Sequence, residues 1–86
     1  MSSYDLFGRS AVLRERAKME GAYAGVRLQY EIIRLADTVE LEFGFEALLH
    51  SHLAIVRSKA TMRQPLLALD CLDAAMQRLI PLEPKS

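Results

Sequence analysis

The sequence predicts an all-α protein, a small bundle of three to four helices with a long apolar central helix, and we expect it to be oligomeric. Its first 64 residues contain no proline and are rich in Ala, Leu, Arg and Glu, which favour helix. There are no Asn-Gly or Asp-Gly hairpin signals and no sustained period-2 alternation, so strands are not expected. A chain of 86 residues makes a single domain, residues 1–86.

The first helix is predicted over about residues 5–42. A break near residue 21 is the alternative, because the stretch MEGAYAG contains two glycines and each interior glycine costs about 1 kcal/mol relative to alanine. Gly44 follows this helix and permits a change of direction before the next one.

A second helix is predicted over residues 45–60 and a third over 65–80, with a tail over 81–86. The apolar face of the second helix consists of Phe45, Leu48, Leu49, His52, Ile55 and Val56. The apolar face of the third consists of Leu69, Leu72, Met76, Leu79 and Ile80, widened by Ala68 and Ala75. The third helix begins either with Thr61 as a cap or with Pro65 in its first turn, and Pro81 ends it.

Residues 21–39, GAYAGVRLQYEIIRLADTV, are apolar on two roughly opposite sides of a helix. One side, which we name the glycine seam, consists of Gly21, Gly25, Leu28, Ile32, Leu35 and Val39. The other side, the tyrosine seam, consists of Met19, Tyr23, Val26, Tyr30, Ile33 and Asp37. Both repeat with the alternating spacing of heptad a and d positions, and a helix that is apolar nearly all round is normally buried.

The two shorter helices can cover one side and part of another, so one seam needs a further cover. The candidates are residues 5–18 folded back as a fourth helix, a second copy of the chain, or a different protein. The apolar face of residues 5–18 is a poor cover, because it consists of Leu6, Ser10, Leu13 and Ala17. We therefore favour self-association or a protein partner over the folded-back helix.

The tyrosine seam is the predicted partner-binding surface. Tyrosine and methionine are enriched at protein–protein interfaces, where a tyrosine hydroxyl can remain partly hydrated. The residues predicted to bind the partner are Met19, Tyr23, Val26, Tyr30 and Ile33. The glycine seam instead suits a permanent internal contact, because its two glycines allow a close approach and its other members are apolar.

Eleven basic and eleven acidic side chains give the chain a formal net charge of zero. This balance disfavours a dedicated nucleic-acid binder or a membrane-surface protein, so neither kind of partner is expected. Two basic clusters leave a small dimeric helical DNA-binding transcriptional regulator as the alternative function. The clusters are Arg9, Arg14, Arg16 and Lys18, and Arg57, Lys59 and Arg63.

No pattern of residues indicates catalysis or a bound cofactor. The sequence contains no glycine-rich phosphate loop, nucleophile elbow or nucleotide fingerprint, so we predict a non-enzymatic protein without a cofactor. His50 and His52 would point about 200° apart on a helix and could not share a metal ion, so no metal is predicted. Cys71, the single cysteine, is interpreted as a small packing residue.

The sequence also indicates a cytoplasmic location. Its longest apolar runs have four residues, the stretch MSSYDLFGRS has no secretory pattern, and a single cysteine cannot form an internal disulfide. We predict a small helical protein–protein interaction module, which would be an adaptor, a chaperone or an assembly subunit. Residues 63–80, RQPLLALDCLDAAMQRLI, open near a proline and carry an alanine-rich apolar stripe. In this they resemble the last helix of the small helical co-chaperones of type III secretion. Of the adaptor, chaperone and assembly-subunit roles, this resemblance implies the chaperone role.

Overall fold

The described part of the chain folds into four helices. The computed structural model describes residues 3–20, 25–44 and 47–79. Its helices are α1 (Ser3–Glu20), α2 (Val26–Phe43), α3 (Ala47–Thr61) and α4 (Pro65–Leu79). These ranges contain no strand, so the predicted all-α bundle is confirmed, with four helices. The tail predicted over 81–86 lies outside the described residues.

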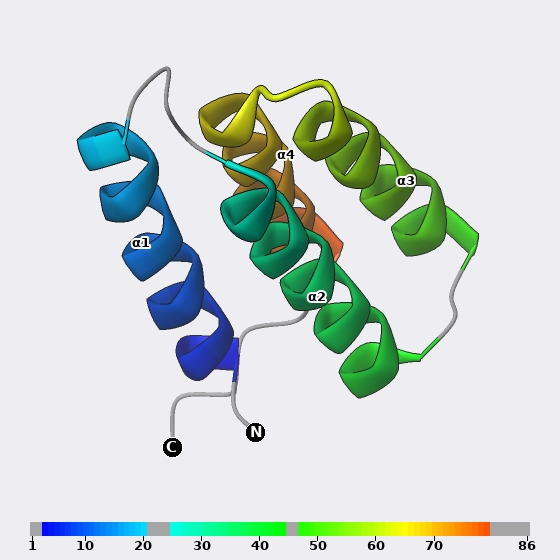
Figure 1. Ribbon diagram of the computed structural model, residues 1–86. Coiled ribbons are helices and arrows are strands. Elements are labelled where there is room, and N and C mark those ends of the chain that lie inside the picture. Colours follow the sequence, from blue (N-terminus) through cyan, green and yellow to red (C-terminus); the bar gives the residue numbers. More distant parts are fainter. Residues whose placement is uncertain (1–2, 21–24, 45–46, 80–86) are drawn as a thin grey trace.

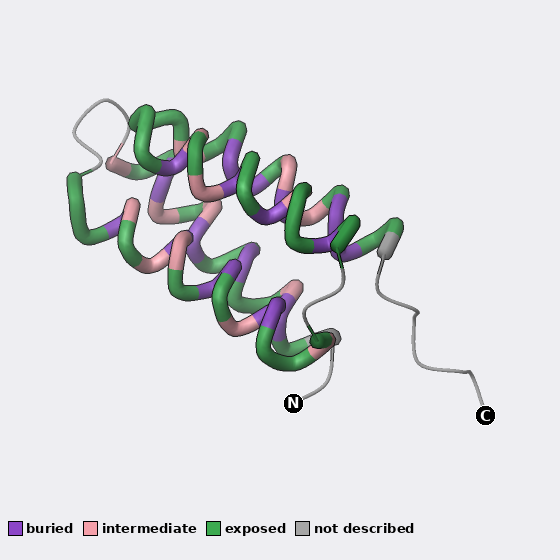
Figure 2. Tube along the Cα trace, turned by 90° about the vertical axis from the view of Figure 1, so that its right-hand side faces the viewer, coloured by how far each residue is buried: buried purple, intermediate pink, exposed green. Residues whose placement is uncertain are grey.

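The helices run alternately up and down. In Figure 1, α1, α2 and α3 lie side by side with α4 behind them. Both α1 and α3 contact α2 and α4, whereas no contact joins α1 to α3 in the part of the chain that the structure describes. Buried residues line the inward sides of the helices and exposed residues their outward sides (Figure 2). The radius of gyration of 12.5 Å is close to the value of about 12 Å expected for a compact chain of this length.

The helix predicted over residues 5–42 is in fact two helices of 18 residues each. α1 ends at Glu20 and α2 begins at Val26, so the break falls in the glycine-containing segment where the sequence allowed one. Gly25 caps α2 in an extended conformation, and its carbonyl accepts a hydrogen bond from the amide of Gln29 at 3.3 Å. The expectation of a single long central helix is therefore wrong.

α1 folds back and closes the bundle, so the judgement that its apolar face is a poor cover is also wrong. All four residues of this face are buried: Leu6, Ser10, Leu13 and Ala17. The small side chains of Ser10 and Ala17 allow α1 to approach its neighbours closely. The buried hydroxyl of Ser10 donates a hydrogen bond to Asp73 at 2.6 Å, so burying this polar group leaves no donor unpaired.

The glycine seam faces the core along most of α2. Its four large residues are each at most 1 % exposed: Leu28, Ile32, Leu35 and Val39. Gly25 is exposed, and Gly21 lies outside the described residues. The prediction of a permanent internal contact is confirmed for the four large residues of this seam.

The buried side of α3 is rotated relative to the prediction. The residues that it buries are Leu49, Leu53, Val56 and Ala60. Leu48 and Ile55, which were predicted to face the core, are about half exposed. Phe45, assigned to the same face, lies outside the described residues. Apolar residues lie on more than one side of α3, so the sequence pattern does not determine which side turns inward.

α4 follows the prediction closely. The predicted apolar face is buried at Ala68, Leu69, Leu72, Ala75 and Met76. Ile80, assigned to this face, lies outside the described residues. Cys71 is half-buried and packs against the core, as expected for a small packing residue. The helix begins at Pro65, which confirms the alternative that placed this residue in the first turn, whereas Thr61 still belongs to α3.

A tight turn joins α3 to α4. The amide of Arg63 donates to the carbonyl of Ala60 at 3.1 Å, and the amide of Gln64 donates to the carbonyl of Lys59 at 3.0 Å. This pair of hydrogen bonds forms a Schellman motif, which requires a left-handed residue just after the helix. Arg63 occupies that position with a φ of 60°, a conformation that glycine adopts at lower cost.

Arg63→Gly should stabilise the protein. A side chain costs about 1–2 kcal/mol in the left-handed region, and glycine loses more freedom on folding, so the expected gain in the free energy of unfolding is about 0.5–1 kcal/mol. Gly44, at the end of α2, has a φ of 84° and provides a control of opposite sign, because Gly44→Ala should destabilise. Urea unfolding followed by circular dichroism measures both. A loss of stability in Arg63→Gly would show that the arginine side chain contributes more than its backbone strain costs.

Candidate protein-interaction surface

Two residues of the tyrosine seam are exposed on the outward side of α2. Tyr30 is 60 % exposed and Val26 is 53 % exposed. Ile33, which follows Tyr30 on the same side of the helix, is half-buried and packs against the core. Tyr23 lies outside the described residues. The structure therefore brings together Val26, Tyr30 and Ile33 out of the five residues predicted to bind a partner.

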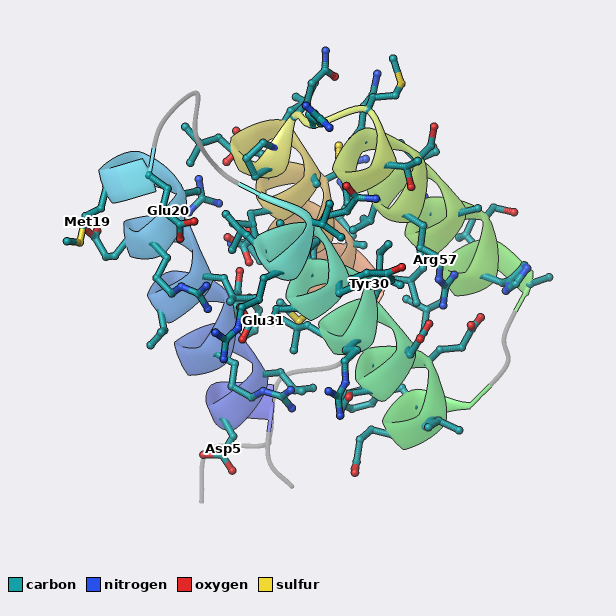
Figure 3. All side chains as sticks on the ribbon, in the orientation of Figure 1. Asp5, Met19, Glu20, Tyr30, Glu31 and Arg57 are labelled. Atoms are coloured by element: carbon teal, nitrogen blue, oxygen red, sulfur yellow. The ribbon has the colours of Figure 1, made fainter. Side chains whose placement is uncertain are left out.

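Met19 lies apart from these residues. It belongs to the last turn of α1, is 84 % exposed, and points away from α2 in Figure 3. The heptad spacing that connected Met19 to Val26 assumed one continuous helix, and the break after Glu20 removes that relation. The prediction that Met19 shares one stripe with Tyr30 is therefore wrong.

Polar contacts attach α1 to α4. The hydroxyl of Ser10 donates to Oδ1 of Asp73 at 2.6 Å, and Arg14 donates to Oδ2 of the same carboxylate at 2.8 Å. Arg14 also donates to Oδ1 of Asp70 at 2.6 Å. Hydrogen bonds to Asp73 and then to Asp70 raise the pKa of the Arg14 guanidinium above its usual value. The charge of Arg14 is therefore paired with those of Asp70 and Asp73 between α1 and α4.

A buried carboxylate attaches α2 to α3. Glu40 is 4 % exposed, and its oxygens lie 2.6 Å from Nδ1 of His50 and 3.0 Å from Nη2 of Arg57. Arg57 also donates to Oδ1 of Asp37 at 2.7 Å. The hydrogen bond from His50 holds the pKa of the Glu40 carboxyl below its usual 4.5, with burial acting against this shift and Arg57 adding to it. The negative charge of Glu40 is therefore stabilised where it joins the two helices.

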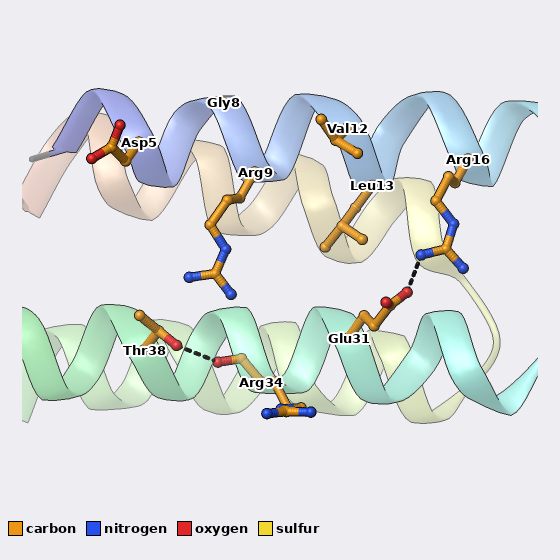
Figure 4. Close-up of a pocket in the computed structure, with 9 residues that line it drawn as sticks. All are labelled: Asp5, Gly8, Arg9, Val12, Leu13, Arg16, Glu31, Arg34 and Thr38. Carbon is orange, nitrogen blue, oxygen red and sulfur yellow. Dashed lines mark hydrogen bonds and ion pairs between the residues drawn. The ribbon is translucent and has the colours of Figure 1, made fainter. Parts of the chain in front are cut away.

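A groove runs between α1 and α2 (Figure 4). Near one end, Arg16 of α1 forms an ion pair with Glu31 of α2. The groove has a volume of about 730 Å³ and is lined by Asp5, Gly8, Arg9, Val12, Leu13 and Arg16 of α1 and by Glu31, Arg34 and Thr38 of α2. The space at Gly8 is open, because a Cβ placed at this residue would meet no atom within 4 Å.

Two arginines of the groove have no ion-pair partner among the described residues. Arg9 extends from α1 toward α2 in Figure 4. Arg34 lies on α2, where its carbonyl accepts a hydrogen bond from the hydroxyl of Thr38 at 2.9 Å while its guanidinium has no described partner. Three arginines and two carboxylates line the groove, so its net charge is +1. The groove is therefore suited to a ligand that carries negative charge.

A second exposed apolar stripe, on α3, was missed by the sequence analysis. Leu48 and Ile55 lie seven residues apart on one side of this helix and are 53 % and 48 % exposed. Met62, which is also exposed, continues the same spacing just beyond the helix. The signal in the sequence was the excess of apolar residues in α3 over the number that one buried side can hold.

The histidines of the HSH stretch have separate surroundings. His50 is in contact with Glu40, and His52 is half-buried elsewhere on α3. Residues 3–20, 25–44 and 47–79 contain no group of three or more His, Cys, Asp or Glu side chains that could hold a metal ion. Within the same ranges, no helix has both the length and the apolar character needed to cross a membrane.

In comparisons with known proteins, the chain matches no family model, no curated protein and no solved structure. The resemblance of residues 63–80 to the co-chaperones of type III secretion therefore stays a prediction. The features that bear on function lie on the surface of the bundle, in particular on the outward side of α2 and in the groove beside it.

Glu40→Gln should destabilise the protein at neutral pH, because it removes the charge that His50 and Arg57 bind. The pKa of Glu40 in the folded protein is below its usual 4.5, so this stabilisation is complete above pH 4.5 and is lost as the pH falls through the folded-state value. The difference in free energy of unfolding between the wild type and the variant should therefore shrink on acidification. Urea unfolding over a pH series measures it, with Glu15→Gln as an exposed control. If Glu40→Gln lowered the free energy of unfolding by the same amount at every pH, the charge of Glu40 would not have the role assigned to it.

Purified protein should contain no stoichiometric metal, and a chelator should leave its thermal midpoint unchanged. The reason is that His50 and His52 project from different sides of α3 and His50 already contacts Glu40. Elemental analysis and thermal unfolding with and without a chelator measure this. About one transition-metal ion per chain would overturn the interpretation of the HSH stretch.

Proposed function

We propose that the chain is a small, non-enzymatic, cytoplasmic helical interaction module that binds another protein through the outward side of α2 and the groove beside it. The observation that carries this proposal is that Tyr30 and Val26 remain more than half exposed although α1 has folded back and buried its own apolar face. Exposed tyrosines next to apolar residues are the side chains that contribute most to protein interfaces. An adaptor, a chaperone and an assembly subunit would all act through such a contact.

Other exposed apolar side chains on the same two helices support an interaction surface. Besides Val26 and Tyr30, the large apolar residues that are more than half exposed on the described parts of α1 and α2 are Val12, Met19 and Leu41. Single exposed apolar residues are common on any protein, whereas several on adjoining helices favour a binding role. Val12 lines the groove itself, so the exposed surface of α1 continues into it.

Binding of DNA, the alternative function, is less well supported. In the first basic cluster, Arg14, Arg16 and Lys18 each form an ion pair with an acidic side chain of the same chain. In the second cluster, Arg57 is bound by Asp37 and Glu40. Contacts with phosphate need cations that are not already paired with a carboxylate. Most of the cations in these two clusters are already paired.

Tyr30→Asp should leave the fold intact and weaken partner binding, whereas Ile32→Asp should unfold the chain. An aspartate at position 30 faces water when no partner is bound. At position 32 the side chain is fully buried, and an unpaired charge there costs several kcal/mol against a total stability of about 5–15 kcal/mol. Circular dichroism and thermal unfolding compare the two variants. If both variants unfolded equally, Tyr30 would have to be buried in the folded chain, and the proposal would lose its support.

Site-specific photo-crosslinking tests the proposed function in cells that make the protein. A photoreactive amino acid replaces Tyr30 in one variant and Glu15, an exposed residue of α1 that does not line the groove, in the control. We expect position 30 to give an adduct whose mass equals the chain plus a different protein, and position 15 to give none. An adduct of two copies would identify self-association in place of a different partner, and no adduct from position 30 would contradict the proposal.

A further inference from the structure

We propose that the groove between α1 and α2 binds an acidic amphipathic helix of the partner protein. The apolar side chains of that helix would contact Val12 and Leu13, and its carboxylates would pair with Arg9 and Arg34. This inference rests on the proposed function, since it names the occupant of the same surface.

The groove has space and an apolar base. Leu13 lies at its base, where it is 9 % exposed, and Val12 beside it is 61 % exposed. Gly8, one turn before Val12, adds no side chain to the space. The volume of about 730 Å³ lies within the range of roughly 300–1,000 Å³ that protein-bound ligands occupy, so several partner side chains fit.

Cations without partners lie on both helices that form the groove. Arg9 belongs to α1 and Arg34 to α2, and neither forms a described ion pair. The charge of Glu31 is already balanced by Arg16, so of the acidic residues in the lining only Asp5 opposes a bound carboxylate. Arginine pairs with carboxylates through two parallel hydrogen bonds, which makes glutamate or aspartate the matching side chain on the partner.

The length of the groove fits a short helix. Its lining on α1 extends from Asp5 to Arg16, which corresponds to about 17 Å at 1.5 Å per residue. A partner helix of about three turns has the same length. Tyr30 does not line the groove, and its side chain extends from α2 toward α3 in Figure 3, so the groove and the exposed tyrosine lie on neighbouring sides of α2.

A second copy of the chain cannot supply the required carboxylates as readily. Among the acidic side chains that the structure describes, all but Asp5 already have an interaction within the chain. Pairing one of them with Arg9 of another copy would make that carboxylate share its charge between two partners. Charge complementarity therefore favours a different, acidic protein as the source of the helix.

A designed peptide serves as the probe. It is a fluorescein-labelled helix of about four turns, with leucine along one face and glutamate on the flanks of that face. Fluorescence anisotropy should show binding to the wild type that weakens at high salt, because exposed charges are then screened. Arg9→Glu and Arg34→Glu should each weaken binding by about tenfold or more. Lys18→Glu, an exposed charge reversal on α1 outside the groove, should leave binding unchanged.

A steric pair of variants tests the position of the peptide independently of charge. Gly8→Trp fills the groove, and the space around Gly8 allows the substitution without a clash at Cβ. Ala11→Trp places the same side chain at an exposed position of α1 that does not line the groove. Gly8→Trp should abolish binding and Ala11→Trp should not, with circular dichroism confirming that both variants are folded.

If the peptide binds, three further results would still overturn the assignment. The first is equal binding by Gly8→Trp and the wild type, and the second is equal binding of a peptide with lysine in place of glutamate. The third is displacement of the peptide by millimolar inorganic phosphate at constant ionic strength, which would assign the arginines to a phosphate group. If the peptide fails but position 30 still crosslinks to a different protein, the groove assignment is wrong and the proposed function stands. If the peptide does not bind and position 30 gives no crosslink, both proposals are wrong.

Discussion

The attachment of α1 to α4 is the contact on which the bundle depends. Over residues 5–20, the inward side of α1 buries only two large side chains, Leu6 and Leu13, while Phe7 packs partly buried against the core. The hydrogen bonds from Ser10 and Arg14 to Asp73 hold α1 at one position along α4, which the weak hydrophobic contact alone would not do. A buried hydroxyl has to be hydrogen-bonded, and Ser10 reaches Asp73 only when α1 lies against α4. The hydrogen bond therefore satisfies the Ser10 hydroxyl in the folded-back position and fixes the register of α1 against α4.

The same packing produces the candidate binding surface. α1 contacts α2 and α4 but, within the described ranges, not α3, and Gly8 and the exposed Val12 do not fill the space between α1 and α2. The ion pair of Arg16 with Glu31 joins the two helices near one end of the groove and leaves Arg9 without a described partner. Because α1 covers α2 only in part, an open and positively charged groove remains between the two helices.

The helical content and two of the buried faces could be predicted from the sequence. Residues such as Ile32 and Leu72 follow a plain helical period, so their burial can be predicted without knowledge of the neighbouring helices. Ser10 was counted as a weakness because its partner, Asp73, is 63 residues away in the sequence. The groove depends on where two separate helices lie, so neither Gly8 nor Arg9 gives a local signal of it.

Hydrogen exchange of the α1 amides, measured residue by residue by nuclear magnetic resonance on the isolated chain, tests most directly whether α1 closes the bundle. If it does, the amides between Leu6 and Ala17 exchange about as slowly as those at the centre of α2, because both helices open only when the bundle opens. Exchange of the α1 amides at the rate of an unprotected chain, with α2, α3 and α4 still protected, would contradict the account. The inward side of α2 would then be accessible to a partner, and the groove would not exist in the isolated protein.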